Sequence, residues 1–74
     1  KEFVTIQLPP NHTLGILRLY NSNGEMLLKT ALQENESRVN LSNLPNGTYI
    51  AEITTEGTLF IKKLIVVDWW IVKK

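Results

Sequence analysis

Apolar and polar residues alternate in short runs along most of the chain. In the first run, residues 3–8, the apolar residues Val4, Ile6 and Leu8 alternate with polar ones. This two-residue period is typical of a β-strand with one buried face, because successive side chains of a strand point to opposite sides. Similar runs recur at spacings of about ten residues, separated by clusters of Asn, Gly, Pro and Ser. The pattern predicts strands over residues 3–8, 15–20, 25–32, 38–41, 48–55 and 58–67.

Two segments carry strong signals for tight hairpin turns. Asn23-Gly24 follows the second predicted strand, and Glu56-Gly57 follows the fifth. Asn and Gly adopt the positive φ that such turns require at little steric cost. We interpret all four glycines as turn residues, so Gly47 should permit the turn before the fifth strand. Leu44, in the same turn, is expected to close one end of the core.

These elements predict an all-β fold: an immunoglobulin-like antiparallel β-sandwich of six or seven short strands, with hairpin links and one longer crossover. A helix over residues 25–36 is the main alternative, since this segment has favourable helix propensities. However, turns flank it, and its apolar residues do not recur with helical spacing over three turns. The last strand is apolar on both faces beyond Lys63, so we expect it in the middle of a sheet or beneath another chain.

Length and composition limit the organisation of the chain and its classes of function. The 74 residues can bury a single core, so one domain is expected. The first residue is Lys1 and not Met, which suggests a piece of a longer polypeptide. The net charge is +1, with the basic residues scattered along the sequence. This charge is too weak to predict binding to nucleic acid or anionic lipid.

The residue types needed for catalysis or metal binding are scarce. Cysteine is absent, and the single histidine, His12, lies in an Asn-rich turn. A zinc site or a nucleophilic site needs several convergent side chains of these types. The glycines do not combine into a phosphate-binding loop. We therefore expect a non-catalytic module with no cofactor and no metal site.

Three segments occur in a characteristic order. Residues 17–27, Leu-Arg-Leu-Tyr-Asn-Ser-Asn-Gly-Glu-Met-Leu, form a strand, a Tyr-Asn pair, a turn glycine and a second strand. Residues 39–50 contain a short strand followed by Leu-Pro-Asn-Gly-Thr-Tyr, and residues 57–66 contain paired lysines in the closing strand. In this order and spacing, the chain resembles the C-terminal sorting domain of type IX (Por) secretion cargo proteins. It lacks the family's usual opening segment, which is similar to Tyr-Pro-Asn-Pro, and it continues beyond the closing strand.

The resemblance implies a sorting domain over residues 1–67 and a C-terminal extension over residues 68–74. A domain of this family follows an N-terminal cargo domain and is exported with it through the periplasm. An outer-membrane translocon reads the domain, and a sortase-like peptidase usually removes it, so that the cargo reaches the cell surface or the medium. Capture of an edge strand or of the closing strand by strand addition would fit a compact sandwich.

Seven residues of the second and third motifs are candidates for recognition: Gly47, Tyr49, Lys62, Lys63, Leu64, Ile65 and Val66. For Gly47 and Tyr49 a structural role is favoured, with Tyr49 filling the core just after the turn. Lys62 and Lys63 either mark the surface presented to the translocon or protect an edge strand against aggregation. The apolar closing strand is also a candidate for homodimer formation.

A structural or adhesive module of a larger extracellular protein is the alternative function. In stalk repeats of the pilin-like kind, a Glu that promotes a Lys–Asn crosslink follows the strand tyrosine by an even number of residues. Here Glu52 follows Tyr49 by three residues, which places it on the opposite face and argues against crosslinking. A carbohydrate-binding module would depend on the adjacent aromatic rings of Trp69 and Trp70.

Overall fold

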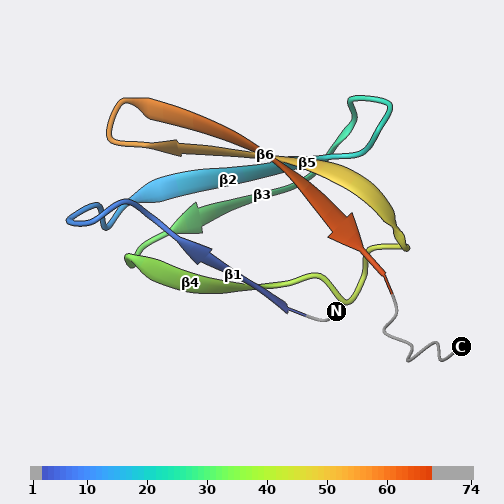
Figure 1. Cartoon of the computed structure of the whole chain (residues 1–74), viewed down its shortest axis with the longest axis horizontal. Coiled ribbons are helices and arrows are strands. Elements are labelled where there is room, and N and C mark those ends of the chain that lie inside the picture. Colours follow the sequence, from blue (N-terminus) through green and yellow to red (C-terminus); the bar gives the residue numbers. More distant parts are fainter. Residues whose placement is uncertain (1–2, 68–74) are drawn as a thin grey trace, which may run out of the picture.

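A computed structural model describes residues 3–67, and every regular element in this range is a β-strand (Figure 1). The strands are β1 (Phe3–Gln7), β2 (Gly15–Tyr20), β3 (Met26–Leu32), β4 (Glu36–Asn40), β5 (Gly47–Thr55) and β6 (Thr58–Val66). The all-β prediction is confirmed, and the segment considered as a helix forms β3 and the start of β4. No helix in the described range could span a membrane. The predicted extension over residues 68–74, with Trp69 and Trp70, lies outside the described residues.

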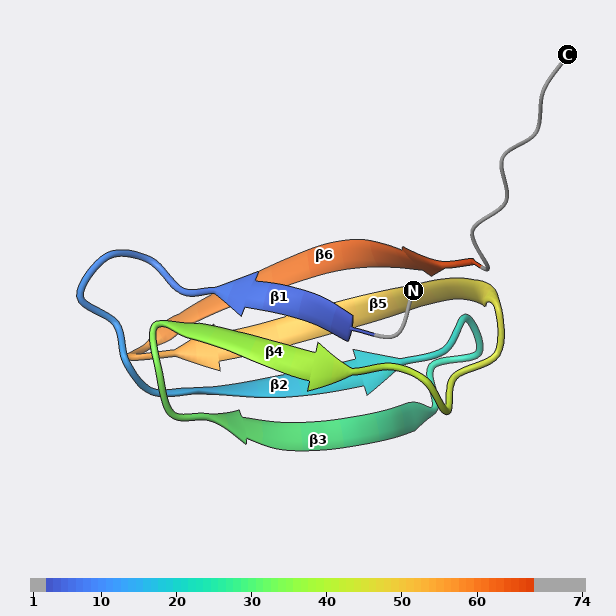
Figure 2. The same ribbon diagram turned by 90° about the horizontal axis from the view of Figure 1, so that it is seen from below.

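The strands form two antiparallel sheets that pack face to face. The larger sheet has the order β3-β2-β5-β6, and β1 pairs with β4 in the smaller sheet. Figure 2 shows β1 and β4 lying over the same face of the larger sheet. β4 begins earlier than predicted, because Glu36 and Ser37 pair with Gln7 and Ile6 of β1. The predicted antiparallel sandwich is confirmed, with six strands in the described part of the chain.

The hydrophobic core lies between the two sheets. Its buried members are Leu8, Leu17, Leu19, Leu32, Val39, Leu41, Tyr49, Ala51 and Val66. Many of these residues occupy alternate positions of their strands, as the two-residue period predicts. Leu44 packs against this cluster, in agreement with its predicted place at the end of the core. Full burial of one leucine side chain contributes about 1.5–3 kcal/mol, so this cluster is the main source of stability.

The four glycines differ in backbone conformation and in their surroundings. Gly24 and Gly57 have φ of 85°, which confirms the two predicted hairpin turns. Gly47, in contrast, is the first residue of β5 and does not have positive φ, so the prediction that it permits a turn is wrong. Gly15 begins β2, and a Cβ atom at this position would lie 3.0 Å from the Thr54 carbonyl oxygen. Gly15 is therefore not a turn residue as predicted, and the close approach of the neighbouring strand explains it.

Side-chain hydrogen bonds close one end of the sandwich. The amide nitrogen of Asn35 donates to the carbonyl oxygens of His12 at 2.8 Å and Pro9 at 2.9 Å. His12 Nδ1 lies 3.1 Å from Thr55 Oγ1, and the Thr55 hydroxyl donates to the Leu14 carbonyl oxygen at 2.6 Å. This network gives His12 a structural contact. It also ties the loop between β1 and β2 to the β3–β4 connection and to the end of β5.

β6 lies at an edge of the larger sheet. It pairs with β5 along its whole length, from Gly47↔Val66 to Thr55↔Thr58, and with no other strand among residues 3–67. The prediction that this strand lies in mid-sheet is therefore wrong. Beyond Lys63 this strand is apolar on both faces, so the alternative prediction, a place beneath another chain, stays open.

Candidate recognition surface

β6 exposes a row of aliphatic side chains on the face of the larger sheet that points away from the core. Leu59, Ile61 and Ile65, which we call the outer row, are 54%, 61% and 62% exposed. Surface apolar residues are ordinary when they are isolated. A row of three on one edge strand is different, because the N–H and C=O groups on the side of β6 away from β5 can pair with another chain. The outer row is therefore a candidate contact surface.

Two adjacent lysines divide this strand at its centre. Lys62 pairs with Ala51, a core residue, so Lys62 extends from the inner face of the sheet. Lys63 pairs with Ile50 and extends from the outer face, between Ile61 and Ile65. Both lysines are exposed, and neither has an ion-pair partner among the described residues. The two positive charges are thus free to interact with a partner on either side of the edge.

A groove lies on the inner side of β6 at Phe60 and Lys62, beside the end of β1. This flank groove is lined by Gln7, Leu8, Pro9, Ile53, Phe60 and Lys62. Ile53 and Phe60 are only partly buried, so the groove has an apolar floor. Lys62 adds a cation to this lining. The groove can therefore receive apolar or acidic side chains from a strand that approaches β6.

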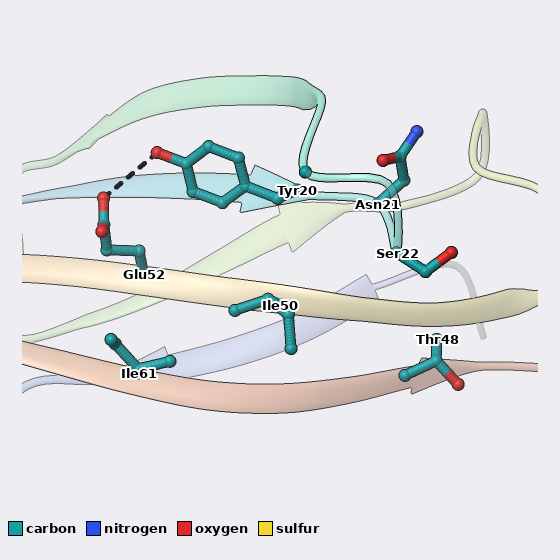
Figure 3. A pocket seen from close by; sticks show the side chains of 8 residues that line it. Tyr20, Asn21, Ser22, Thr48, Ile50, Glu52 and Ile61 are labelled. Carbon is teal, nitrogen blue, oxygen red and sulfur yellow. Dashed lines mark hydrogen bonds between the residues drawn. The ribbon is translucent and has the colours of Figure 1, made fainter.

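A second hollow lies on the outer face, beside the outer row (Figure 3). The side chains of Ile50 and Ile61 line it together with the ring of Tyr20 and the carboxylate of Glu52. The Tyr20 hydroxyl donates a hydrogen bond to Glu52 Oε1 at 3.2 Å, and Arg18 Nη1 lies 3.8 Å from the same oxygen. These contacts hold the carboxylate over the centre of the sheet, so the hollow combines an apolar part with a fixed charge.

The environment of Tyr20 alters its acidity. Removal of the phenol from water raises the pKa of Tyr20 above its ordinary value of 10.0. The negative charge of Glu52 and the hydrogen bond to it raise this pKa further, while the charge of Arg18 lowers it. Tyr20 is therefore a neutral hydrogen-bond donor at physiological pH. It acts as a positioning group for Glu52.

Tyr49 explains the Leu-Pro-Asn-Gly-Thr-Tyr motif in structural terms. Its ring is 5% exposed, and its hydroxyl donates to the carbonyl oxygen of Pro45, four residues upstream. A tyrosine near the start of a strand that bonds back to the preceding corner is a recurrent device of β-sandwiches. A Cβ atom at Gly47 would lie 3.8 Å from the Tyr49 ring, an ordinary contact distance. The motif therefore builds a corner of the core.

The seven predicted recognition residues come together on β5 and β6, because Gly47 pairs with Val66 and Tyr49 with Leu64. Tyr49 and Val66 are buried, so a partner cannot contact them while the fold is intact. The exposed members are Gly47, Lys62, Lys63 and Ile65. The prediction omitted Ile61 and the hollow beside Tyr20. The alternation through residues 58–61 could have indicated Ile61, whereas the hollow depends on how three strands pair.

The described residues contain no group of three or more His, Cys, Asp or Glu side chains that could hold a metal ion.

A comparison with known families gives one clear result: the model of the secretion system C-terminal sorting domain matches residues 1–67. This match includes all six described strands. No curated protein and no solved structure matches the chain. The chain belongs to the family of secretion system C-terminal sorting domains.

Proposed function

We propose that this domain is a non-catalytic sorting signal that directs a cargo protein through the type IX secretion system, and that the machinery reads β6. Membership of the family supports the first part, because its domains are C-terminal signals carried by cargo of this system. The destination is then the cell surface or the extracellular space. The second part is specific to this chain and depends on the exposed edge of β6.

One observation carries the assignment to β6. β6 combines a free edge, a row of three exposed aliphatic side chains and two lysines that have no ion-pair partner among the described residues. A strand with these features binds extended peptides by adding them to its sheet, with main-chain hydrogen bonds for affinity and side chains for selectivity. β3, the opposite edge of the same sheet, carries exposed Met26 and Leu27 only at its first two positions.

The rest of the proposed route is what the resemblance to this family implies. The cargo domain precedes β1 in the chain and passes through the periplasm with the signal attached. An outer-membrane translocon binds the folded domain at β6, together with the exposed residues Gly47, Lys62, Lys63 and Ile65. The half-buried Leu64 and the buried Tyr49 and Val66 support that surface from within. A sortase-like peptidase then separates the cargo from the signal.

A secretion assay tests this proposal. A signal peptide, a fluorescent passenger and residues 1–74 are fused and expressed in a bacterium that has the type IX machinery, and in a strain that lacks the translocon. A second fusion ends at Val67. A third carries Ile61→Asp and Ile65→Asp, and its matched control carries Met26→Asp at the exposed start of β3. Fluorescence is measured in the medium, on the cells and in the periplasm.

We expect the passenger to reach the surface or the medium only when the translocon is present. The double substitution in the outer row should keep most of the passenger in the periplasm, while the Met26→Asp fusion is exported normally. Retention of every fusion with a folded domain would contradict the sorting function. Normal export of the outer-row variant would contradict the assignment of recognition to β6 and would leave the sorting function intact.

A further inference from the structure

The free edge of β6 offers an incoming strand two faces with different chemistry. The outer row and Lys63 lie on one side, and Phe60 and Lys62 lie on the other, beside the flank groove. We propose that the partner strand carries two consecutive carboxylates flanked by aliphatic residues, and that it pairs with β6 so that the carboxylates lie opposite Lys62 and Lys63. The biological setting rests on the proposed function, because the strand would belong to the secretion machinery.

The lysines require two adjacent acidic residues, one on each face. Residues directly opposite in paired strands share a face, and opposite charges in such pairs are favourable. Because Lys62 and Lys63 extend from opposite faces, one carboxylate alone can neutralise only one of them. Glu52, the carboxylate that lines the hollow on the outer face, is already paired with Arg18 and Tyr20. Both ammonium groups therefore depend on the partner for a counter-charge.

The positions on either side of the lysines require apolar side chains. On the outer face, aliphatic residues opposite Ile61 and Ile65 would cover side chains that are now more than half exposed. On the inner face, the residue opposite Phe60 would enter the flank groove, where Ile53 forms part of the apolar floor. The resulting pattern is an acidic pair at the centre of an otherwise uncharged strand.

A second copy of β6 does not have this pattern. Residues 58–66 contain two lysines and no acidic residue. When two copies of residues 58–66 pair about a two-fold axis, every register places each lysine opposite a lysine or an uncharged residue. An ammonium group therefore meets no carboxylate in any register. Charge complementarity favours a different, acidic strand over a homodimer through this edge.

A peptide titration tests the inference on the 74-residue chain. The probe is the synthetic peptide Thr-Val-Thr-Glu-Glu-Val-Val-Val. Paired antiparallel to β6, it places its glutamates opposite the two lysines, three valines opposite the outer row and the fourth valine opposite Phe60. One control has Lys-Lys in place of Glu-Glu, and a second has the same composition with one Glu at each end. Amide chemical shifts of the protein report the position of binding, and their concentration dependence gives Kd.

We expect the acidic peptide to shift the amides of β6 and leave those of β3 unchanged. Its Kd should be about tenfold or more below that of the lysine peptide, since two unlike-charge pairs become two like-charge pairs. The chain with Lys62→Glu and Lys63→Glu should reverse this preference. The control variant Lys29→Glu, at an exposed residue of β3, should keep the preference for the acidic peptide. Equal binding of all peptides, or no shift on β6 with the acidic peptide, would overturn the inference.

Two further outcomes separate this inference from its alternatives. A concentration-dependent dimer that shifts the β6 amides without peptide would make a second copy the occupant and would contradict it. Export of the passenger together with indifference of β6 to the acidic peptide would overturn the inference and leave the sorting function intact. Binding of the acidic peptide to β6 with no export of the passenger would contradict the sorting function and leave the inference about the partner strand intact.

Discussion

At the scale of single residues, the same amino acid has different roles in this domain, and backbone geometry separates them. Gly57 has φ of 85°, with no atom within 4 Å of a Cβ placed on it, so only its backbone conformation requires glycine. Gly47 lies in an ordinary strand conformation. Sequence reasoning treated both as turn residues, because Pro-Asn-Gly and Glu-Gly are equally good turn signals and φ cannot be read from them.

Alanine at these two positions should therefore have different effects. We expect Gly57→Ala to lower the free energy of unfolding by about 1 kcal/mol, because a left-handed conformation is unfavourable for residues with a Cβ atom. In a domain of this size, that loss lowers Tm by about 4–8 °C. Gly47→Ala should change Tm by much less. Thermal unfolding followed by circular dichroism checks this, and equal losses for both variants would contradict the assigned roles.

Tyr20 provides a prediction about alkaline pH. Its folded pKa is raised by burial, by the charge of Glu52 and by their hydrogen bond, so the fold favours the neutral phenol. The corresponding stability is fully present below the unfolded pKa of about 10 and is lost as pH rises through the folded value. We expect Glu52→Gln to lower the pKa of Tyr20 and to weaken this alkaline loss.

The ultraviolet absorbance of tyrosinate measures this pKa directly, and Tyr20→Phe identifies which transition belongs to Tyr20. Glu34→Gln is the matched control, because Glu34 is an exposed carboxylate in the β3–β4 connection. The Tyr20 transition should stay unchanged in that variant. If Glu52→Gln left the transition of Tyr20 where it is, the negative charge of Glu52 would not lie beside the Tyr20 hydroxyl in solution.

At the scale of the elements, the alternating pattern predicted the existence of every strand and the inward-facing residues of most of them. Leu17, Leu19, Val39, Leu41, Tyr49 and Ala51 are all buried, as their alternation indicates. The pattern could not place β6 in its sheet. A strand that is apolar on both faces fits a central position as well as an edge that awaits a partner, and only the pairing distinguishes them. The candidate surface on β6 includes the predicted residues Lys62, Lys63 and Ile65, and their role in recognition stays a prediction.

The two lysines should also limit self-association of this edge. Like charges opposite each other destabilise a strand pair, so a symmetric β6 pair is weakened while Lys62 and Lys63 are present. We expect the variant Lys62→Val with Lys63→Val to associate at about tenfold lower protein concentration than the parent chain. Sedimentation velocity measures this, with Lys29→Val as the control for loss of a charge. A monomeric double variant would show that the lysines do not protect the edge.

At the scale of the whole molecule, the smaller sheet is held by packing and by contacts at the two ends of the sandwich. β1 and β4 contribute Val4, Ile6 and Val39 to the interface between the sheets. At one end, Tyr49 bonds to the corner before β5, and at the other, Asn35 bonds to the loop that follows β1. The Asn35 contacts join segments that are distant in sequence, so no local pattern could have predicted them, whereas the Tyr49 bond spans only four residues.

Asn35 should accordingly be important for the stability of the whole domain. Its backbone oxygen accepts a hydrogen bond from the Leu8 amide at 2.8 Å, and its side chain donates to the carbonyl oxygens of Pro9 and His12. Asn35→Ala removes the side-chain donor and leaves partly buried carbonyl groups without it. We expect the free energy of unfolding in urea to fall by about 1–2 kcal/mol. Asn43→Ala, in an exposed turn, should change it by less than about 0.5 kcal/mol.

Hydrogen exchange can show where the loss acts. If Asn35 holds the end of β1 against the rest of the sandwich, the amides of β1 and β4 should exchange faster in Asn35→Ala than in the parent chain, while those of β2 and β5 change less. A uniform acceleration across both sheets would instead mean that the domain unfolds as one unit. In that case the network would stabilise the fold without holding the smaller sheet in particular. Either pattern would show whether the flank groove can widen while the larger sheet, with its β6 edge, stays folded.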